Sequence, residues 1–167
     1  MRRPLLAATA LLAGLAGTAL AAEPSAKPAY PPGLEIGFAI PKPPALIFAA
    51  RDVADINKAV AFYTEALGMK VVGGNEPPGG DIKEVFVGFG TDAQSAKVLL
   101  AHHKKEKLPA QHGAGTRLII SVADLPATLK AVAAKGGKVT KTPAQAGGAN
   151  IAWVADPDGY EIELSQP

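Results

Sequence analysis

The sequence predicts an α+β fold in which two tandem βαβββ modules form a curved, mixed sheet around a cavity. Two local repeats and one change of period support this. The sequence VADI at residues 53–56 returns as VADL at 122–125, and GMKV at 68–71 returns as GGKV at 136–139. Apolar residues before each GMKV-like repeat have helical spacing, whereas those after it alternate as in strands.

The first 21 residues have the pattern of a signal peptide. Arg2 and Arg3 precede a short run of leucine, alanine and glycine, which ends in small residues near Ala21. Such a run favours export and cleavage over a retained anchor helix, which is the alternative. We therefore expect a secreted or periplasmic protein that makes no membrane contact after signal cleavage.

Residues 22–44 form a proline-rich arm or linker. Seven prolines remove backbone donors there and favour extended structure. The remaining residues, 45–167, suit one domain, with modules at about 45–103 and 116–167.

Composition excludes several classes of function. The chain has no cysteine, so thiolate catalysis, disulfides and cysteine zinc sites are excluded. Lys and Arg number 17 against 15 Asp and Glu, and loss of Arg2 and Arg3 with the leader leaves a neutral chain. Because nucleic-acid binding requires a concentrated basic surface, we expect no nucleic-acid partner.

Each module begins with an apolar strand followed by a capped helix. The strands are expected at 46–50 and 118–122, and Asp55 and Asp124 follow them as helix N-caps. Apolar stripes then mark the helices at Ile56, Ala59, Val60, Tyr63 and Leu67, and at Leu125, Leu129 and Val132. Gly68 and Gly136 are suited to ending the helices.

The other strands follow from alternation, at residues 70–72, 84–89 and 98–101, and at 138–140, 151–155 and 160–164. In the last strand Ile162 and Leu164 are expected to pack on the helix, which turns Glu163 to the opposite face. The same parity turns Arg117 to that face from the first strand of the second module. Arg117 and Glu163 are thus predicted to share the cavity.

Two stretches carry a resemblance to a known family. FYTEALGMK at residues 62–70 and DPDGYEIEL at 156–164 resemble the vicinal oxygen chelate superfamily, which includes glyoxalase I, bleomycin-resistance proteins and extradiol dioxygenases. The chain is most similar to the glyoxalase I branch, from about residue 45 to 167. The resemblance implies a glyoxalase-like fold and a homodimer whose clefts are built from paired units of two chains.

The resemblance also implies a divalent metal held by two histidines and two glutamates. Counted from the two stretches and from VFVGFG at 85–90, those four positions hold Phe48, Leu99, Arg117 and Glu163. Only Glu163 matches, and catalytic zinc needs three protein ligands. The fixed charge of Arg117 also opposes a dication. We therefore expect no metal and no other cofactor.

Our interpretation is that Arg117 replaces the metal as the cation opposite Glu163, with Phe48 and Leu99 as apolar walls of a metal-free pocket for a small molecule. The alternative is a salt bridge that only fills the cavity. Trp153, the single tryptophan, is either a core residue or part of the ligand site.

Three histidines are the other possible metal ligands. His102 and His103 are neighbours on a strand and point to opposite faces, so they cannot bind one ion together. An alternative metal site would join His103, His112 and Glu163, whereas the simpler interpretation is exposed surface histidines.

The sequence leaves two functions open. One is an exported protein that binds a small molecule of unknown identity, like the metal-free bleomycin-resistance members. The other is a lyase or isomerase of the lactoylglutathione lyase type, with a degenerate or displaced metal site and Glu163 as the catalytic general base. The sequence alone does not decide whether the protein is an enzyme.

Overall fold

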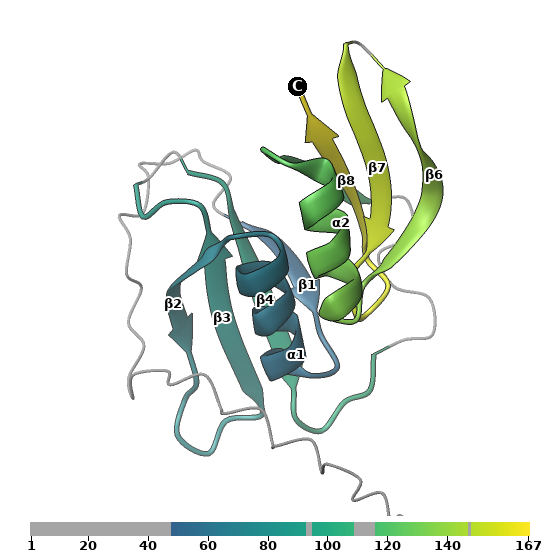
Figure 1. The fold of residues 1–167 in the computed structure, drawn as a ribbon. Helices are drawn as coiled ribbons and strands as arrows, with labels where there is room; N and C mark the ends of the chain where they lie inside the picture. Colours follow the sequence, from purple (N-terminus) through teal and green to yellow (C-terminus); the bar gives the residue numbers. More distant parts are fainter. Residues whose placement is uncertain (1–47, 93–94, 109–115, 147) are drawn as a thin grey trace, which may run out of the picture.

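The computed structural model describes residues 48–92, 95–108, 116–146 and 148–167. Two four-stranded sheets each carry one helical segment (Figure 1). In chain order the elements are β1 Ala49–Asp52, α1 Ile56–Ala61, η1 Phe62–Ala66, β2 Lys70–Asn75, β3 Ile82–Gly88, β4 Lys97–His103, β5 Arg117–Ser121, α2 Leu125–Ala134, β6 Lys138–Ala146, β7 Ala149–Ala155 and β8 Glu161–Gln166. The predicted α+β fold of two βαβββ modules is confirmed.

The two sheets have the same topology. Their strand orders are β1-β4-β3-β2 and β5-β8-β7-β6. The first strand of each module pairs in parallel with the last, and the other pairings are antiparallel. The leader and the proline-rich arm lie outside the described residues. Within the described ranges, the model contains no helix of the length and apolarity that a membrane span requires.

Both helices begin and end as the sequence predicts. The carboxylate of Asp55 accepts hydrogen bonds from the backbone N–H groups of Asn57 and Lys58, and Asp124 accepts one from Ala127. These bonds satisfy donors that the first helical turn leaves without partners. Gly68 and Gly136 follow the helical segments with φ of +74° and +84°, a conformation that costs least for glycine.

The first helix differs from the prediction because α1 continues into the π-helix η1. A π-helix places more residues in each turn than an α-helix, which changes the residues that face the sheet. Phe62 and Tyr63 are adjacent in sequence and both are completely buried. The regular stripe predicted Tyr63 at the core but did not include Phe62.

Strand β6 is longer than expected, since it reaches Ala146 and not Thr140. Its pairing with β7 shifts register between Val139 and Lys141 and again between Lys141 and Ala144. The second shift spans Pro143, which has no N–H group to donate across a sheet. Irregular pairing of this kind interrupts the alternation on which the sequence prediction depended.

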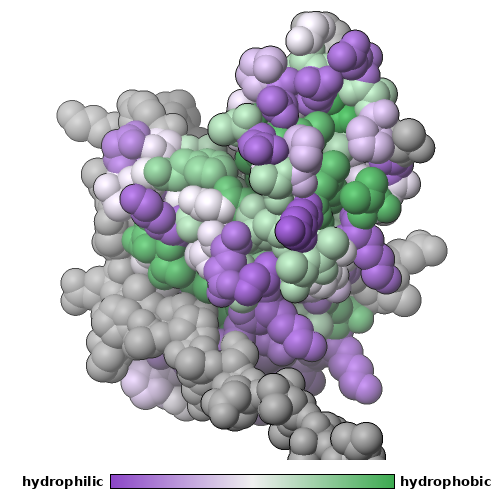
Figure 2. Space-filling view, in the orientation of Figure 1, coloured by the Kyte–Doolittle hydropathy of each residue, from purple (hydrophilic) through white to green (hydrophobic). Residues whose placement is uncertain are grey.

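A single hydrophobic core runs through both modules. The first helical segment packs on β3 and β4, α2 packs on β6, β7 and β8, and α2 also contacts η1 (Figure 1). Hydrophobic and hydrophilic side chains are intermixed on the helix-bearing side of the molecule (Figure 2). The face of the second sheet opposite α2, called the open face below, includes Ile119, whose exposed fraction is 62%.

A buried ion pair joins the two modules. Nη1 of Arg51 on β1 lies 3.3 Å from Oδ2 of Asp156, a residue that precedes β8. The same Nη1 donates a hydrogen bond to the Tyr63 hydroxyl at 2.8 Å. That hydroxyl donates to Asp156 at 2.9 Å, and Nη2 of Arg51 donates to the Glu161 carbonyl at 3.1 Å. Burial, followed by the neighbouring Asp156 carboxylate, raises the pKa of Tyr63 well above its usual value. This network fixes β1 against the start of β8.

Candidate binding site

The strand register positions Arg117 and Glu163 on the open face. In the parallel pair β5–β8, Arg117 lies opposite Glu161 and Ile119 lies opposite Glu163. Alternate residues, including Ile162, are buried toward α2, as predicted. Nε of Arg117 lies 2.9 Å from Oε2 of Glu163, so the expected pair forms diagonally between neighbouring strands.

The acid of this pair lies deeper than the base. The Glu163 side chain is 13% exposed, whereas that of Arg117 is 49% exposed. Nε1 of Trp153, directly opposite Glu163 on β7, donates to the same Oε2 atom at 3.2 Å. The guanidinium of this pair is therefore more accessible to solvent than the carboxylate.

Trp153 belongs to this site and not to the buried core between sheet and helix. Its side chain is half-buried, and its neighbours Ala152 and Val154 supply the buried side of β7. The hydrogen bond to Glu163 satisfies the indole N–H, the only polar group of this side chain. The sequence left two roles open for Trp153, and the geometry supports a place in the site over a place in the core. Contact between Trp153 and a ligand stays a prediction.

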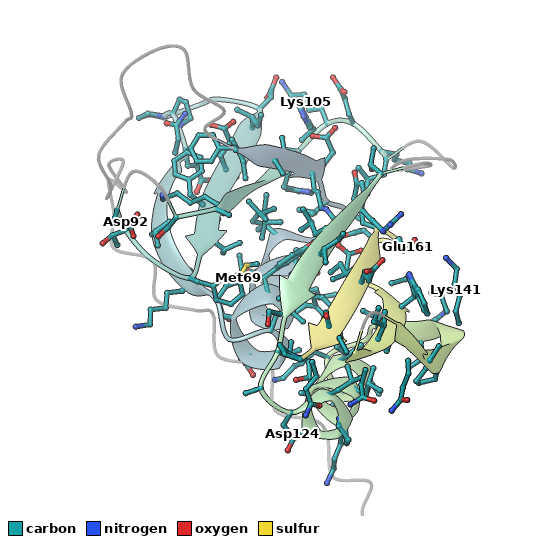
Figure 3. All side chains as sticks on the ribbon, turned by 90° about the horizontal axis from the view of Figure 1, so that it is seen from above. Met69, Asp92, Lys105, Asp124, Lys141 and Glu161 are labelled. Carbon is teal, nitrogen blue, oxygen red and sulfur yellow. The ribbon has the colours of Figure 1, made fainter. Side chains whose placement is uncertain are left out.

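A second cation lies at the other edge of the open face. Lys141 is opposite Trp153 in the β6–β7 register, and its Nζ is 5.3 Å from the centre of the indole ring. The same Nζ lies 3.2 Å from Oε2 of Glu161. Figure 3 shows the Lys141 and Glu161 side chains close together on this part of the molecule. Two ion pairs, Arg117–Glu163 and Lys141–Glu161, thus lie beside one indole on the open face.

The first sheet repeats the geometry with apolar residues. Leu99 pairs with the residue two positions after Phe48, just as Glu163 pairs with the residue two positions after Arg117. The four predicted site positions are therefore equivalent pairs in the internal repeat. The structure brings Arg117, Glu163 and Trp153 together, while Leu99 is on β4 of the other sheet and Phe48 directly precedes β1 of that sheet. That all five line one pocket stays a prediction.

Phe48 makes an aromatic contact within its own sheet. Its ring stacks on that of Phe86 with centroids 4.9 Å apart and an interplanar angle of 19°. Phe86 lies opposite Leu99 in the β3–β4 register, so these three apolar side chains share one sheet face. This supports an apolar surface at the positions where the resemblance implied a histidine and a glutamate.

The residues present do not fit a divalent metal with four protein ligands. A guanidinium, a phenyl ring and an isobutyl group offer no lone pair to a metal, and Oε2 of Glu163 already forms the ion pair with Arg117 and accepts a hydrogen bond from Trp153. Across the described ranges, no group of three or more His, Cys, Asp or Glu side chains could hold an ion. That the protein binds no metal stays a prediction.

His102 and His103 each have a partner within the first module. His102 lies with Nδ1 3.0 Å from the Val53 carbonyl oxygen, and His103 lies with Nε2 3.4 Å from Oδ1 of Asp52. His103 is on the first sheet and Glu163 on the second, and His112 lies outside the described residues. The described geometry gives the alternative site of His103, His112 and Glu163 no support.

A hollow of about 760 Å³ lies elsewhere on the second module. It is lined by residues at the start of α2 and on β6 and β7, together with Gln166, whose Oε1 accepts a hydrogen bond from Leu125 N. Its one carboxylate, Asp124, caps α2. No pattern in the sequence indicates this hollow, because strands β6 and β7 run further than the alternation of their residues.

The chain is similar to known proteins of one family. The profile of the glyoxalase/bleomycin resistance protein/dioxygenase superfamily matches residues 46–164. A probable lactoylglutathione lyase of Vibrio parahaemolyticus is 38% identical over 119 residues, which are 68% of this chain and 84% of that protein. One from Synechocystis is 36% identical over 117 residues, covering 68% of this chain and 88% of that protein.

Solved structures show the same similarity. Glyoxalase I from Zea mays aligns with a TM-score of 0.63 and 31% identity, over 72% of this chain and 44% of that chain. The trypanothione-dependent glyoxalase I of Leishmania major aligns with a TM-score of 0.63 and 27% identity, over 73% of this chain and 86% of that chain. The chain thus spans less than half of the maize protein but most of the Leishmania one.

Proposed function

Since the chain belongs to the glyoxalase/bleomycin resistance protein/dioxygenase superfamily, we propose that it is a binding protein that holds a small organic molecule on its open face without a metal. The observation that carries the proposal is the contact of 2.9 Å between Arg117 Nε and Glu163 Oε2. A fixed positive charge occupies one of the four implied ligand positions and is bonded to the one implied ligand that the chain keeps.

We also propose that the protein is exported and that it forms a dimer. The basic and apolar leader of residues 1–21 supports export. The 52% exposure of Phe89, which lies outside the open face, supports a partner, because an exposed large apolar side chain gains stability when a second surface covers it. Fractionation of cells that express the full chain tests the first point, and sedimentation equilibrium of the mature protein tests the second.

A second function, that of a lactoylglutathione lyase, has its own support. The relatives from Vibrio parahaemolyticus and Synechocystis carry that name, and the similarity covers 84% and 88% of their lengths. Glu163 is the one implied ligand that remains, and since both of its donors bind Oε2, a base role would use Oε1. A lyase would therefore act through this carboxylate or through ligands outside the described residues.

One experiment separates the two functions. Protein purified without chelators is analysed for zinc and nickel, and the same sample is assayed with the hemithioacetal of methylglyoxal and glutathione. A binding protein of the proposed kind contains less than stoichiometric metal and gives no turnover, with or without added zinc or nickel. Stoichiometric metal together with turnover that Glu163→Gln abolishes would establish the lyase and overturn the binding protein.

A further inference from the structure

We propose that the ligand of the open face is a small organic carboxylate with an apolar body, whose carboxylate binds the guanidinium of Arg117 and whose body lies on Ile119 and Trp153. This inference rests on the proposed metal-free binding function and names the chemical class of the ligand. Three features support it: the donors left on Arg117, the greater exposure of the cations than of their carboxylates, and the apolar surface beside them.

Arg117 keeps donors for a ligand. A guanidinium has five N–H donors in one plane, and the ion pair with Glu163 is made through Nε. Within the described residues no other ion pair of Arg117 is present, and half of the side chain is exposed. The Nη1 and Nη2 groups together form the planar fork that suits a carboxylate with two parallel hydrogen bonds.

The greater exposure of the cations favours an anion. Glu163 is much less exposed than Arg117, at 13% against 49%, and its Oε2 contacts both Arg117 and Trp153. The carboxylate therefore holds the guanidinium through Nε and leaves the exposed Nη groups to a ligand. Lys141, whose ammonium group lies near the indole, is paired with Glu161, and the cation is again the more exposed partner, at 55% against 33%. In both pairs the cation is therefore more accessible to an approaching molecule than its carboxylate.

The surface beside the guanidinium is apolar. Ile119 is on the same strand face as Arg117, two residues further along β5, and it is 62% exposed. The half-buried indole of Trp153 lies across the strand that carries Glu163. A hydrocarbon group attached to the bound carboxylate would remove this surface from water, at roughly 25 cal/mol for each Å² buried. A carboxylate without such a group gains only the charge-assisted hydrogen bonds.

The experiment uses three probes that separate the effect of the charge from that of the apolar body. Phenylacetate is the carboxylate, phenylacetamide is its neutral counterpart, and acetate is the carboxylate without an apolar body. Trp153 is the single tryptophan of the chain and belongs to the site, so its fluorescence reports binding, and titration calorimetry gives an independent measurement. We expect phenylacetate to bind about tenfold or more tightly than either other probe.

Variants assign the effect to Arg117. Arg117→Met is expected to weaken phenylacetate binding about tenfold or more, and Arg117→Lys, which keeps the charge but loses the fork, to weaken it less. Lys135→Met is the matched control, because Lys135 pairs with Glu65 on the helix-bearing side, and it should leave the affinity unchanged. Circular dichroism confirms that each variant is folded.

Each outcome bears on one of the two proposals. If phenylacetamide binds as tightly as phenylacetate, and Arg117→Met and Arg117→Lys bind as the parent does, the carboxylate class is wrong while metal-free binding stands. Failure of phenylacetate to bind the parent protein also overturns the carboxylate class. If phenylacetate binds only after stoichiometric zinc or nickel is added, the metal-free function itself is wrong.

Discussion

Arg117 Nε lies 2.9 Å from Glu163 Oε2 on the neighbouring parallel strands β5 and β8. The first module has Phe48 and Leu99 at the equivalent positions, which are a phenyl ring and an isobutyl group. One module therefore keeps a charged pair and the other an apolar pair, on strands of the same topology.

Restoring the implied ligands should create a metal site. The triple variant Phe48→His, Leu99→Glu and Arg117→His places two histidines and two carboxylates at the four positions, a donor set suited to a divalent ion. We expect micromolar or tighter zinc or nickel binding by calorimetry. Arg117→His alone supplies too few ligands and serves as the control. A folded triple variant that binds no metal would show that the four positions are assigned wrongly.

The buried ion pair Arg51–Asp156 should contribute strongly to stability. The two side chains are 5% and 1% exposed. Arg51→Met leaves the Asp156 carboxylate buried without its cation, which costs about 3–5 kcal/mol in the free energy of unfolding. Lys141→Met, which breaks the exposed pair with Glu161, should cost about 1 kcal/mol or less. Urea denaturation measures both, and equal losses would contradict the special role of the buried pair.

Tyr63 should make the protein less stable at alkaline pH. Its folded-state pKa is raised, first by burial and then by Asp156. The unfolded chain therefore releases the phenol proton first, at about pH 10, so this contribution to stability is complete below that pH and declines above it. In Tyr63→Phe the free energy of unfolding, measured by urea denaturation, should fall less steeply between about pH 9.5 and 11 than in the parent protein. An unchanged slope relative to the parent would count against the raised pKa.

The sequence predicted the order of elements because both modules repeat the same signals. Asp55 and Asp124 cap the helices, and two glycines end them with positive φ. The sequence also predicted the faces of β5 and β8, since strand parity alone places Arg117 and Glu163 together. Such local rules are sufficient where a strand or helix is regular.

The misses lie where regular periodicity fails or where contacts are distant in sequence. The π-helix buries Phe62 as well as Tyr63, which a period of 3.6 does not predict. The partner of Arg51 is Asp156, 105 residues away, and only the tertiary fold brings them together. One signal in the sequence pointed to a buried partner for Arg51. This charged residue has the same strand parity as Val53, which places it on the side that packs against the helix.

Gly137 should tolerate no side chain. A Cβ atom there would lie 2.6 Å from Phe62 Cε2, 2.8 Å from the Ala155 carbonyl oxygen and 2.8 Å from Val132 Cγ1. Gly137→Ala should therefore destabilise the protein by about 1–3 kcal/mol. Gly68→Ala, where no atom lies within 4 Å but φ is +74°, should cost about 1 kcal/mol. Thermal unfolding compares the two, and a smaller loss for Gly137→Ala would contradict the tight packing.

The most direct test of a guanidinium in the metal position is a crystal structure of the mature protein grown with nickel, with anomalous data collected at the nickel edge. We predict that Arg117 Nε is hydrogen-bonded to Glu163 and that no anomalous peak lies within about 3 Å of that carboxylate, a range that contains the direct metal–ligand distances. A nickel peak on Glu163, with Arg117 turned away into solvent, would contradict the account.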